Sequence, residues 1–315
     1  MFKSIHSEFI LTPLMDTVIQ ALNASKAVDD TINTYALSEY FFQSLFLKLT
    51  GAQEQKMKCI YWDLATNDFK YRYALMNNKS YGECSSYDDK NGIYKDIINV
   101  LKRKVPSCCP LQIWQFVELD GDTVKSEHKR WEEREYKDRE RRLKGNIKAQ
   151  EAKGKVLTAE VKAKMHAKIV DAPLDESLFQ QHLLTVKKEK YISHTLHQII
   201  SLFKGTTLQS WAEKDYDFFE KHAHGLFKGL SFMNQKNGLL DANLQSYYRV
   251  IVYEHRNRCA HNTMSYQKNL PTLSMLRDNI YLYQNYFYRY AFLLLLDEVF
   301  IRMYQTLTTT DFTNV

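Results

Sequence analysis

The sequence predicts an all-α fold, and three observations support this prediction. Only ten glycines and five prolines occur among 315 residues, whereas a β-barrel or β-sandwich needs a turn about every ten residues. Apolar and aromatic residues recur at helical spacing over long stretches. Because 44% of the residues are hydrophobic, the chain is able to bury a large core in one large domain or two smaller ones.

The N-terminal region, residues 1–120, is expected to be helical, and part of it is expected to belong to the same bundle as the C-terminal region. Apolar stripes predict helices at residues 12–27, 33–48 and 52–75. Gly51 is expected to end the second of these helices.

The rest of this region is less regular. The polar composition of residues 77–92 predicts a loop. A further helix is expected at residues 93–104, ended by Pro106. Residues 111–119 fit either a strand or the start of a helix.

The second region, residues 121–172, is predicted to be a basic, charged helical insertion. Residues 125–168 contain fifteen lysines and arginines and eight acidic residues, a net charge of +7, while the whole chain carries +6. Helix propensity is high, but apolar residues are too sparse for a core-facing stripe. Two interpretations stay open. One is a solvated hairpin that bends near Gly145 or Gly154, and the other is an arm that binds nucleic acid by releasing counterions from phosphates.

The third region, residues 173–315, predicts packed helices again. Apolar periodicity places them at residues 174–204, as one bent helix or two, and at residues 211–232, 239–261 and 275–307.

Neither a metal, a cofactor nor a membrane segment is expected. The five cysteines are an odd number, and no C-x-x-C pair or matching histidine spacing provides a zinc site. No Gly-rich phosphate loop or H-E-x-x-H sequence occurs. The N-terminal residues lack a signal-peptide pattern, and the longest apolar run, at residues 291–296, is too short for a bilayer. These features predict a cytoplasmic protein with reduced thiols.

The most unusual stretch ends the helix predicted at residues 239–261. An apolar and aromatic run at residues 247–253 is followed by a group of charged and polar side chains. These eight residues are Glu254, His255, Arg256, Asn257, Arg258, Cys259, Ala260 and His261. Buried helices seldom carry so much charge unless it is paired or functional. A purely structural explanation is that Arg256 and Arg258 stabilise a helix C-terminus through the helix dipole.

The six residues from Arg256 to His261 resemble the Arg-Asn-x-x-x-His form of the R-x(4–6)-H signature of the HEPN superfamily. HEPN domains are antiparallel α-helical bundles, and many are ribonucleases of toxin–antitoxin, abortive-infection and CRISPR systems. The resemblance covers roughly residues 174–307, with the helices at 33–75 as a further candidate part. It implies a metal-independent endoribonuclease that acts as a toxin or in antiviral defence. RNA is then the substrate, Arg256 and His261 are the catalytic pair, and Asn257 supports them.

The chemistry of RNA cleavage agrees with these residue types. RNA carries its own nucleophile, the 2′-OH, so cleavage needs no metal if a base removes that proton, and histidine has a suitable pKa. A fixed guanidinium is able to meet the negative charge that gathers on the nonbridging oxygens. Residues 256 and 261 lie about 140° apart on a straight helix. Both therefore face one cleft only if the helix ends or distorts near Cys259 and Ala260.

Further residues are assigned supporting roles. Glu254, Arg258 and His261 share a helix face, so an ion pair between the first two is expected to position the imidazole. Asn257 lies one turn before His261, where its amide would fix the orientation of the ring. The remote acidic position of the HEPN family is assigned to Glu39.

A homodimer is also expected, because HEPN ribonucleases typically dimerise so that two motifs face one cleft. An antitoxin or another regulatory partner is implied as well. The aromatic rings at residues 281–290 exceed what one helix face buries in a monomer, which favours a shared surface. Alternatively, these rings cover the segment 125–168 or the first helices within one chain. Two other functions stay open: a non-catalytic HEPN module that binds nucleotide or RNA or scaffolds a complex, and a helical adaptor for protein interaction.

Overall fold

The structure is a computed structural model. It describes residues 4–25, 35–78, 83–106, 110–154, 156–228, 238–261 and 280–309. Throughout these ranges every regular element is a helix, so the all-α prediction is confirmed. Two compact units form: unit 1 comprises Met1–Ile113 and Tyr191–Val315, and unit 2 comprises Trp114–Lys190. None of the helices in the described ranges has both the length and the hydropathy needed to cross a membrane.

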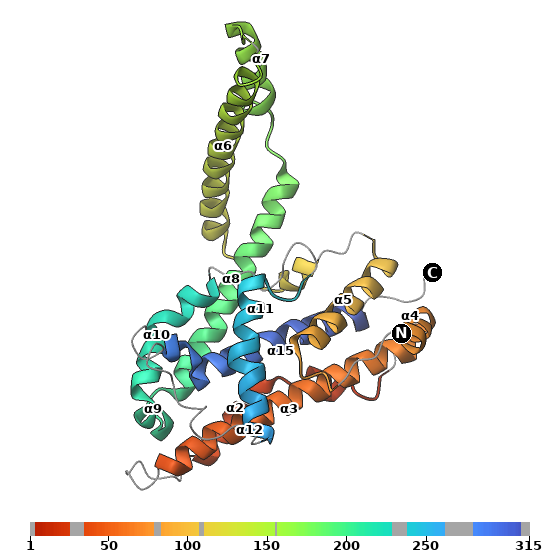
Figure 1. The fold of residues 1–315 in the computed structure, drawn as a ribbon, viewed down its shortest axis with the longest axis vertical. Coiled ribbons are helices and arrows are strands. Elements are labelled where there is room, and N and C mark those ends of the chain that lie inside the picture. Colours follow the sequence, from red (N-terminus) through yellow and green to blue (C-terminus); the bar gives the residue numbers. More distant parts are fainter. Residues whose placement is uncertain are drawn as a thin grey trace. The chain divides into compact units, whose positions relative to one another are not determined.

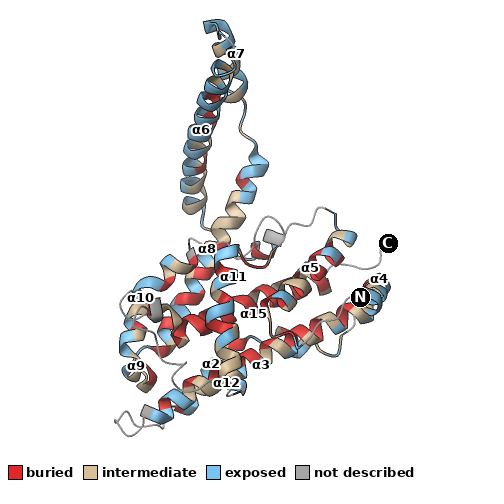
Figure 2. Cartoon of the chain, in the orientation of Figure 1, coloured by how far each residue is buried: buried red, intermediate tan, exposed pale blue. Residues whose placement is uncertain are grey.

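Helix α15 (Tyr286–Thr309) is the central element of unit 1 (Figures 1 and 2). Residues 287–297 are buried without exception, as expected for a helix that is apolar on all sides. Its neighbours are α1 (Ser7–Leu11), α2 (Leu14–Ser25), α3 (Tyr35–Asn67), α5 (Tyr87–Lys104) and α10 (Glu213–Lys228). Asn285 caps its first turn, with Oδ1 accepting the N–H of Tyr288 at 3.0 Å.

The aromatic side chains at the start of α15 are buried within the chain, which corrects one argument for a dimer. Phe287, Tyr288 and Tyr290 have exposures of 1% or less. The Tyr290 hydroxyl donates to the carbonyl of Phe42 on α3 at 2.9 Å. Side chains of α3 and α10 in the same chain cover these rings: Phe42 packs against Phe287 and Tyr290, and Phe219 packs against Phe287 and Tyr288. These three rings therefore give no support to a shared dimer surface. Tyr283 and Tyr286 are half-buried, and the side chain of Tyr281 lies outside the described part of the structure.

Helix α3 runs without interruption past Gly51, so the prediction that Gly51 ends a helix is wrong. A glycine inside a helix costs only about 1 kcal/mol relative to alanine. The packing of α3 against α15, α5 and α2 outweighs this cost. After one non-helical residue, Asp68, the chain continues as α4 (Phe69–Asn78).

Helix α5 begins inside the loop predicted at residues 77–92, and that prediction is wrong for its second half. Ser86 is the N-cap, with its hydroxyl accepting the N–H of Asp89 at 3.0 Å. Two acidic residues lie in the first turn, where the helix dipole favours them. The polar residues thus start a helix. It ends at Lys104, as predicted.

A buried ion pair joins three helices of unit 1. Lys56 of α3 contacts Asp297 of α15 at 2.7 Å, and each side chain is 2% exposed. The other carboxylate oxygen of Asp297 accepts the N–H of Leu14, the first residue of α2, at 2.8 Å. Buried charges are tolerated when they are paired and hydrogen-bonded. This pair therefore fixes α2 against α3 and α15.

The remaining helices of unit 1 follow along the chain. Helix α8 (Glu176–Phe203) is a single helix that begins in unit 2 and ends in unit 1. The elements after it are α9 (Thr207–Trp211), α10, α11 (Ala242–Tyr248), the π-helical turn η3 (Arg249–Tyr253), α12 (Glu254–His261) and the 3-10 helix η4 (Ile280–Gln284). The helix predicted at residues 239–261 is thus three consecutive helical segments.

Unit 2 contains α6 (Gly121–Glu151) and α7 (Ala159–Ile169), which pack against each other (Figure 1). Helix α6 continues through Gly145, and Gly154 lies in the turn that follows it, with a φ of +74° that favours glycine. The ring of Trp131 on α6 lies 5.3 Å from that of Phe179 on α8. Although its apolar residues are sparse, α6 therefore has a buried face.

The buried face of α6 also contains a charged side chain, Arg139. The side chain is 11% exposed, and it pairs with Glu135 at 3.4 Å. Its guanidinium also donates to the carbonyls of Val170, Ala172 and Pro173. Arg139 therefore binds the chain that leads from α7 to α8, because it satisfies backbone acceptors that are in no regular element.

Residues 111–119 do not form the predicted strand, and only their first part is helical. The 3-10 helix η2 (Pro110–Trp114) is followed by irregular chain up to the start of α6. Lys187 of α8 donates to the carbonyl of Gln115 at 3.0 Å, and Lys190 donates to that of Glu118 at 3.0 Å. These lysines supply the hydrogen bonds that a strand or helix would have provided.

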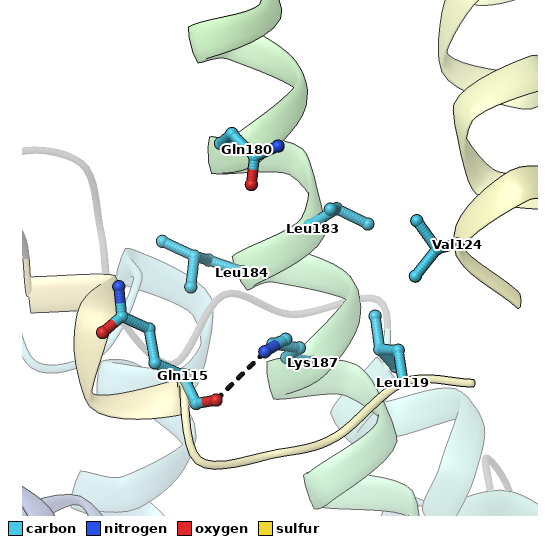
Figure 3. Close-up of a pocket in the computed structure, with 7 residues that line it drawn as sticks. All are labelled: Gln115, Leu119, Val124, Gln180, Leu183, Leu184 and Lys187. Atoms are coloured by element: carbon cyan, nitrogen blue, oxygen red, sulfur yellow. Dashed lines mark hydrogen bonds between the residues drawn. The ribbon is translucent and has the colours of Figure 1, made fainter. Parts of the chain in front are cut away.

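A pocket of about 330 Å³ lies within unit 2 (Figure 3). Its lining consists of Gln115, Leu119, Val124, Gln180, Leu183, Leu184 and Lys187. Figure 3 shows the ammonium of Lys187, the one charged group of this lining, directed at the Gln115 carbonyl. None of the predicted site residues lines the pocket.

Candidate active site

The helix that carries the motif changes its winding immediately before the motif. Helix α11 is α-helical, η3 is a π-helical turn, and α12 is α-helical again. The N–H of Glu254 donates to the carbonyl of Arg249, five residues earlier, which is the π-type hydrogen bond. Single π turns inside helices occur frequently at functional sites.

Arg289 of α15 stabilises this π turn from outside the helix. Its Nε donates to the carbonyl of Ile251 at 2.8 Å, and its guanidinium lies 5.0 Å from the centre of the Tyr286 ring. Burial lowers the pKa of Arg289 to about 10, so the side chain stays charged near neutral pH. The buried cation fixes η3 against α15, and with it the start of α12.

Arg256 lies on α12, and its guanidinium contacts Glu54 and Asn257. Its Nη2 pairs with Oε2 of Glu54 on α3 at 3.0 Å, and its Nη1 donates to Oδ1 of Asn257 at 3.2 Å. The side chains of Arg256 and Glu54 are 21% and 12% exposed. The guanidinium is therefore partly accessible to solvent, and a charge-assisted hydrogen bond limits its orientation.

Two of the predicted supporting residues form the expected ion pair. Nη1 of Arg258 lies 4.0 Å from Oε2 of Glu254, one turn earlier on α12. The Glu254 side chain is 56% exposed, so this contact contributes little to stability. His261 is the last residue of α12, and its side chain lies outside the described part of the structure.

The irregular turn does not lie where the sequence geometry required it. Helix α12 is regular from Glu254 to His261, whereas a distortion was needed near Cys259 and Ala260. Positions 256 and 261 are therefore about 140° apart around the helix axis.

His255 lies in a hydrogen-bonded group that joins α3, α12 and α15. Its Nε2 is 3.3 Å from the Tyr286 hydroxyl and 3.4 Å from Sγ of Cys259. The Tyr286 hydroxyl also donates to Oε1 of Glu39 at 3.3 Å. Glu39, the acidic residue assigned by resemblance, thus reaches α12 through Tyr286, whereas the carboxylate beside the motif arginine belongs to Glu54.

Burial keeps His255 neutral. Burial, and then the positive charges of Arg289 and Arg258, lower the pKa of His255 to about 2. Such an imidazole is a poor general base near neutral pH. Burial also raises the pKa of the Cys259 thiol, which keeps it protonated and unreactive. This group therefore anchors the motif helix and does not form a second catalytic pair.

No cluster of three metal-ligating side chains lies among the residues that the structure describes. His194 and His197 line a pocket of about 430 Å³ in unit 1. The ring of His197 lies 4.5 Å from that of His224. A structural zinc site uses four protein ligands, so this histidine contact does not resemble one.

Comparison with protein-family models, with curated proteins and with solved structures finds no match for this chain. The geometry and chemistry of the motif helix therefore carry the functional interpretation.

Two residues that organise the motif helix, Glu54 and Arg289, are not among the residues predicted from the sequence. Glu54 is 202 positions away from Arg256, and no local pattern connects them. Arg289 offers a signal, because it interrupts the otherwise apolar and aromatic start of α15. A charge in such a helix needs a buried partner, and here that partner is the carbonyl of Ile251.

Proposed function

We propose that this protein is a metal-independent endoribonuclease with an HEPN-like helical bundle, and that it acts as a toxin or an antiviral effector. The observation that carries the proposal is the Arg256 guanidinium, held by Glu54 and Asn257 on the helix that bears the Arg-Asn-x-x-x-His sequence. Its partial exposure leaves it accessible to a substrate phosphate. The all-α environment of this helix is the one in which HEPN motifs occur.

In the proposed reaction the 2′-oxygen of the RNA attacks the adjacent phosphorus, and the bond from phosphorus to the 5′-oxygen breaks. His261 removes the 2′-OH proton as general base. Arg256 stabilises the negative charge on the nonbridging oxygens. Water supplies a proton to the leaving 5′-oxygen, and the proton that His261 removed returns to solvent, so that the products are a 2′,3′-cyclic phosphate and a 5′-OH.

The geometry of α12 favours a site composed of two copies. Because positions 256 and 261 diverge by about 140° on one helix, the arginine of one copy is expected to act with the histidine of the other. Two-fold symmetry then gives two equivalent clefts. The proposed homodimer rests on this geometry, since the aromatic residues of α15 do not support it.

A non-catalytic HEPN-like module is the second candidate function. The observation that favours it is the same ion pair, because Glu54 neutralises the Arg256 charge in the isolated chain. In that case the motif would be structural, and the protein would bind RNA or nucleotide without cleaving it.

The test is cleavage of labelled tRNA and total RNA in EDTA by the full chain. Wild type is expected to cleave, whereas Arg256→Ala and His261→Ala should each lose activity by ~100-fold or more while still folding. Arg258→Ala is the matched comparison, because it removes an arginine from the same helix and should reduce activity less than either of these substitutions. Equal cleavage by wild type and His261→Ala would contradict the proposal, and wild type that binds RNA without cleaving it would favour the second candidate.

A further inference from the structure

The cations of α6 are concentrated on one side of the helix. Between residues 130 and 148 there are eight lysines and arginines, and six of them recur at alternating spacings of four and three residues. These six, named the α6 basic stripe, are Arg130, Arg134, Lys137, Arg141, Lys144 and Lys148. At 100° per residue these six side chains occupy an arc of about 80° around the helix axis. No other residue between positions 130 and 148 falls within this arc.

Acidic residues are absent from this arc. The five acidic residues between positions 130 and 148 all fall outside it at the same helical periodicity. The closest of them, Glu133, lies about 60° from the centre of the stripe. A surface that is only solvated tends to intersperse the two signs of charge, whereas this helix separates them.

All six side chains of the stripe are exposed, and Figure 2 shows that most of α6 is exposed or intermediate. The buried residues of α6 are Trp131, Arg139 and Leu143, and they occupy positions outside the arc. The buried face of α6 therefore lies outside the stripe, and of the six stripe residues Arg134 contacts α8, with Nη2 lying 3.1 Å from Nε2 of His182. Over eighteen residue steps the stripe is about 27 Å long, at a rise of 1.5 Å per residue.

Three of the six cations have no ion-pair partner in the described part of unit 2. These are Lys137, Lys144 and Lys148. Arg130 pairs with Glu127 at 2.7 Å, and Arg141 pairs with Asp138 at 2.9 Å. Exposed pairs of this kind contribute only about 0–1 kcal/mol, so both arginines are able to exchange their carboxylates for phosphates.

We propose that the α6 basic stripe binds the phosphate backbone of RNA. A linear row of closely spaced cations matches a polyanion, whose binding gains free energy from counterion release. A membrane surface is disfavoured because the arc contains no apolar residue that would enter the lipid. The inference rests on the proposed function for its choice of RNA, but binding at the stripe does not require that Arg256 and His261 cleave it.

The salt dependence of binding gives the expected magnitude. Six phosphate contacts predict a slope of log K against log salt of about −4 for single-stranded RNA and about −5 for a duplex. Removing three cations should make this slope less negative by about 2. At 0.1 M salt this corresponds to a ~100-fold loss of affinity for single-stranded RNA.

The experiment measures binding by the full chain to a fluorescent 2′-O-methyl RNA of thirty nucleotides. This RNA lacks the 2′-OH nucleophile, so binding is measured without cleavage. The test variant is Lys137→Gln/Lys144→Gln/Lys148→Gln. The matched control is Lys125→Gln/Lys129→Gln/Arg142→Gln, which removes three exposed cations of the same helix outside the arc. Circular dichroism shows whether both variants remain helical.

The proposal predicts that the test variant loses ~100-fold in affinity and about 2 in slope, whereas the control retains nearly wild-type binding. Equal weakening of both variants would overturn it, because net charge would then explain the binding. Wild type that binds poly-glutamate but not RNA would overturn it in favour of an acidic protein partner. If the test variant binds RNA normally while wild type still cleaves native RNA, the stripe proposal fails and the proposed function stands.

Discussion

The pair formed by Glu54 and Arg256 provides the most informative stability prediction. An exposed ion pair contributes about 0–1 kcal/mol, whereas breaking a buried one costs about 3–5 kcal/mol. With side chains 12% and 21% exposed and a contact of 3.0 Å, this pair lies between those limits. We expect a coupling free energy of ~2 kcal/mol from a double-mutant cycle.

The cycle consists of wild type, Glu54→Gln, Arg256→Ala and the double variant, each unfolded with urea at pH 7. The control cycle uses Glu254→Gln and Arg258→Ala, because that pair is 4.0 Å apart and more exposed, and its coupling should be below about 0.5 kcal/mol. Glu54→Gln should also slow RNA cleavage by ~10-fold, since the guanidinium loses its fixed orientation. A coupling near zero for Glu54 and Arg256 would refute this description of the site.

Three further predictions concern pH, the core and the dimer. The pKa of His255 is lowered to about 2 in the folded chain. Below pH 6.5 the imidazole of His255 therefore binds a proton in the unfolded chain but not in the folded chain. The stability due to neutral His255 is therefore present above pH 6.5 and lost on acidification, and wild type should lose ~1–2 kcal/mol more than His255→Asn between pH 6.5 and 5.0. Equal losses in urea unfolding would contradict this. Lys56→Met should lower the free energy of unfolding by ~3–5 kcal/mol, because it leaves the Asp297 carboxylate buried without its ion-pair partner. The double variant Lys56→Met/Asp297→Leu should recover most of that stability. If it does not, the polar contacts themselves are needed. Coexpressed Arg256→Ala and His261→Ala chains should regain up to about a quarter of wild-type cleavage, because half of the dimers would be mixed and each would hold one intact cleft; a stable dimer without activity would place the arginine and histidine in one chain.

The sequence predicts the helical class correctly for a physical reason. Scarce glycine and proline, together with apolar periodicity, leave few alternatives to long helices. Local signals fail where packing competes with them. Gly51 does not end α3, because tertiary contacts outweigh a weak propensity. The polar residues after Ser86 start α5, since N-cap chemistry and loop chemistry use the same residue types.

The candidate site also combines features that the local sequence predicts with contacts that it does not predict. The position of the motif on a long helical stretch follows from periodicity, and α12 carries all six of its residues. The contact between Glu54 and Arg256 depends on how α3 meets α12, which no local pattern encodes. The sequence of residues 249–253 also does not predict the π turn η3, because Arg289 of another helix stabilises this turn. Nonlocal partners therefore had to come from the structure.

The most direct test of the central claim is the chemical identity of the RNA ends produced in EDTA. Purified full chain is incubated with a defined RNA in the presence of EDTA, and the ends are identified by enzymatic labelling and mass spectrometry. Attack by the 2′-OH predicts 2′,3′-cyclic phosphate and 5′-OH ends, formed by wild type and absent with Arg256→Ala. Fragments with 5′-phosphates, or activity that disappears in EDTA and returns with Mg²⁺, would contradict the proposed mechanism.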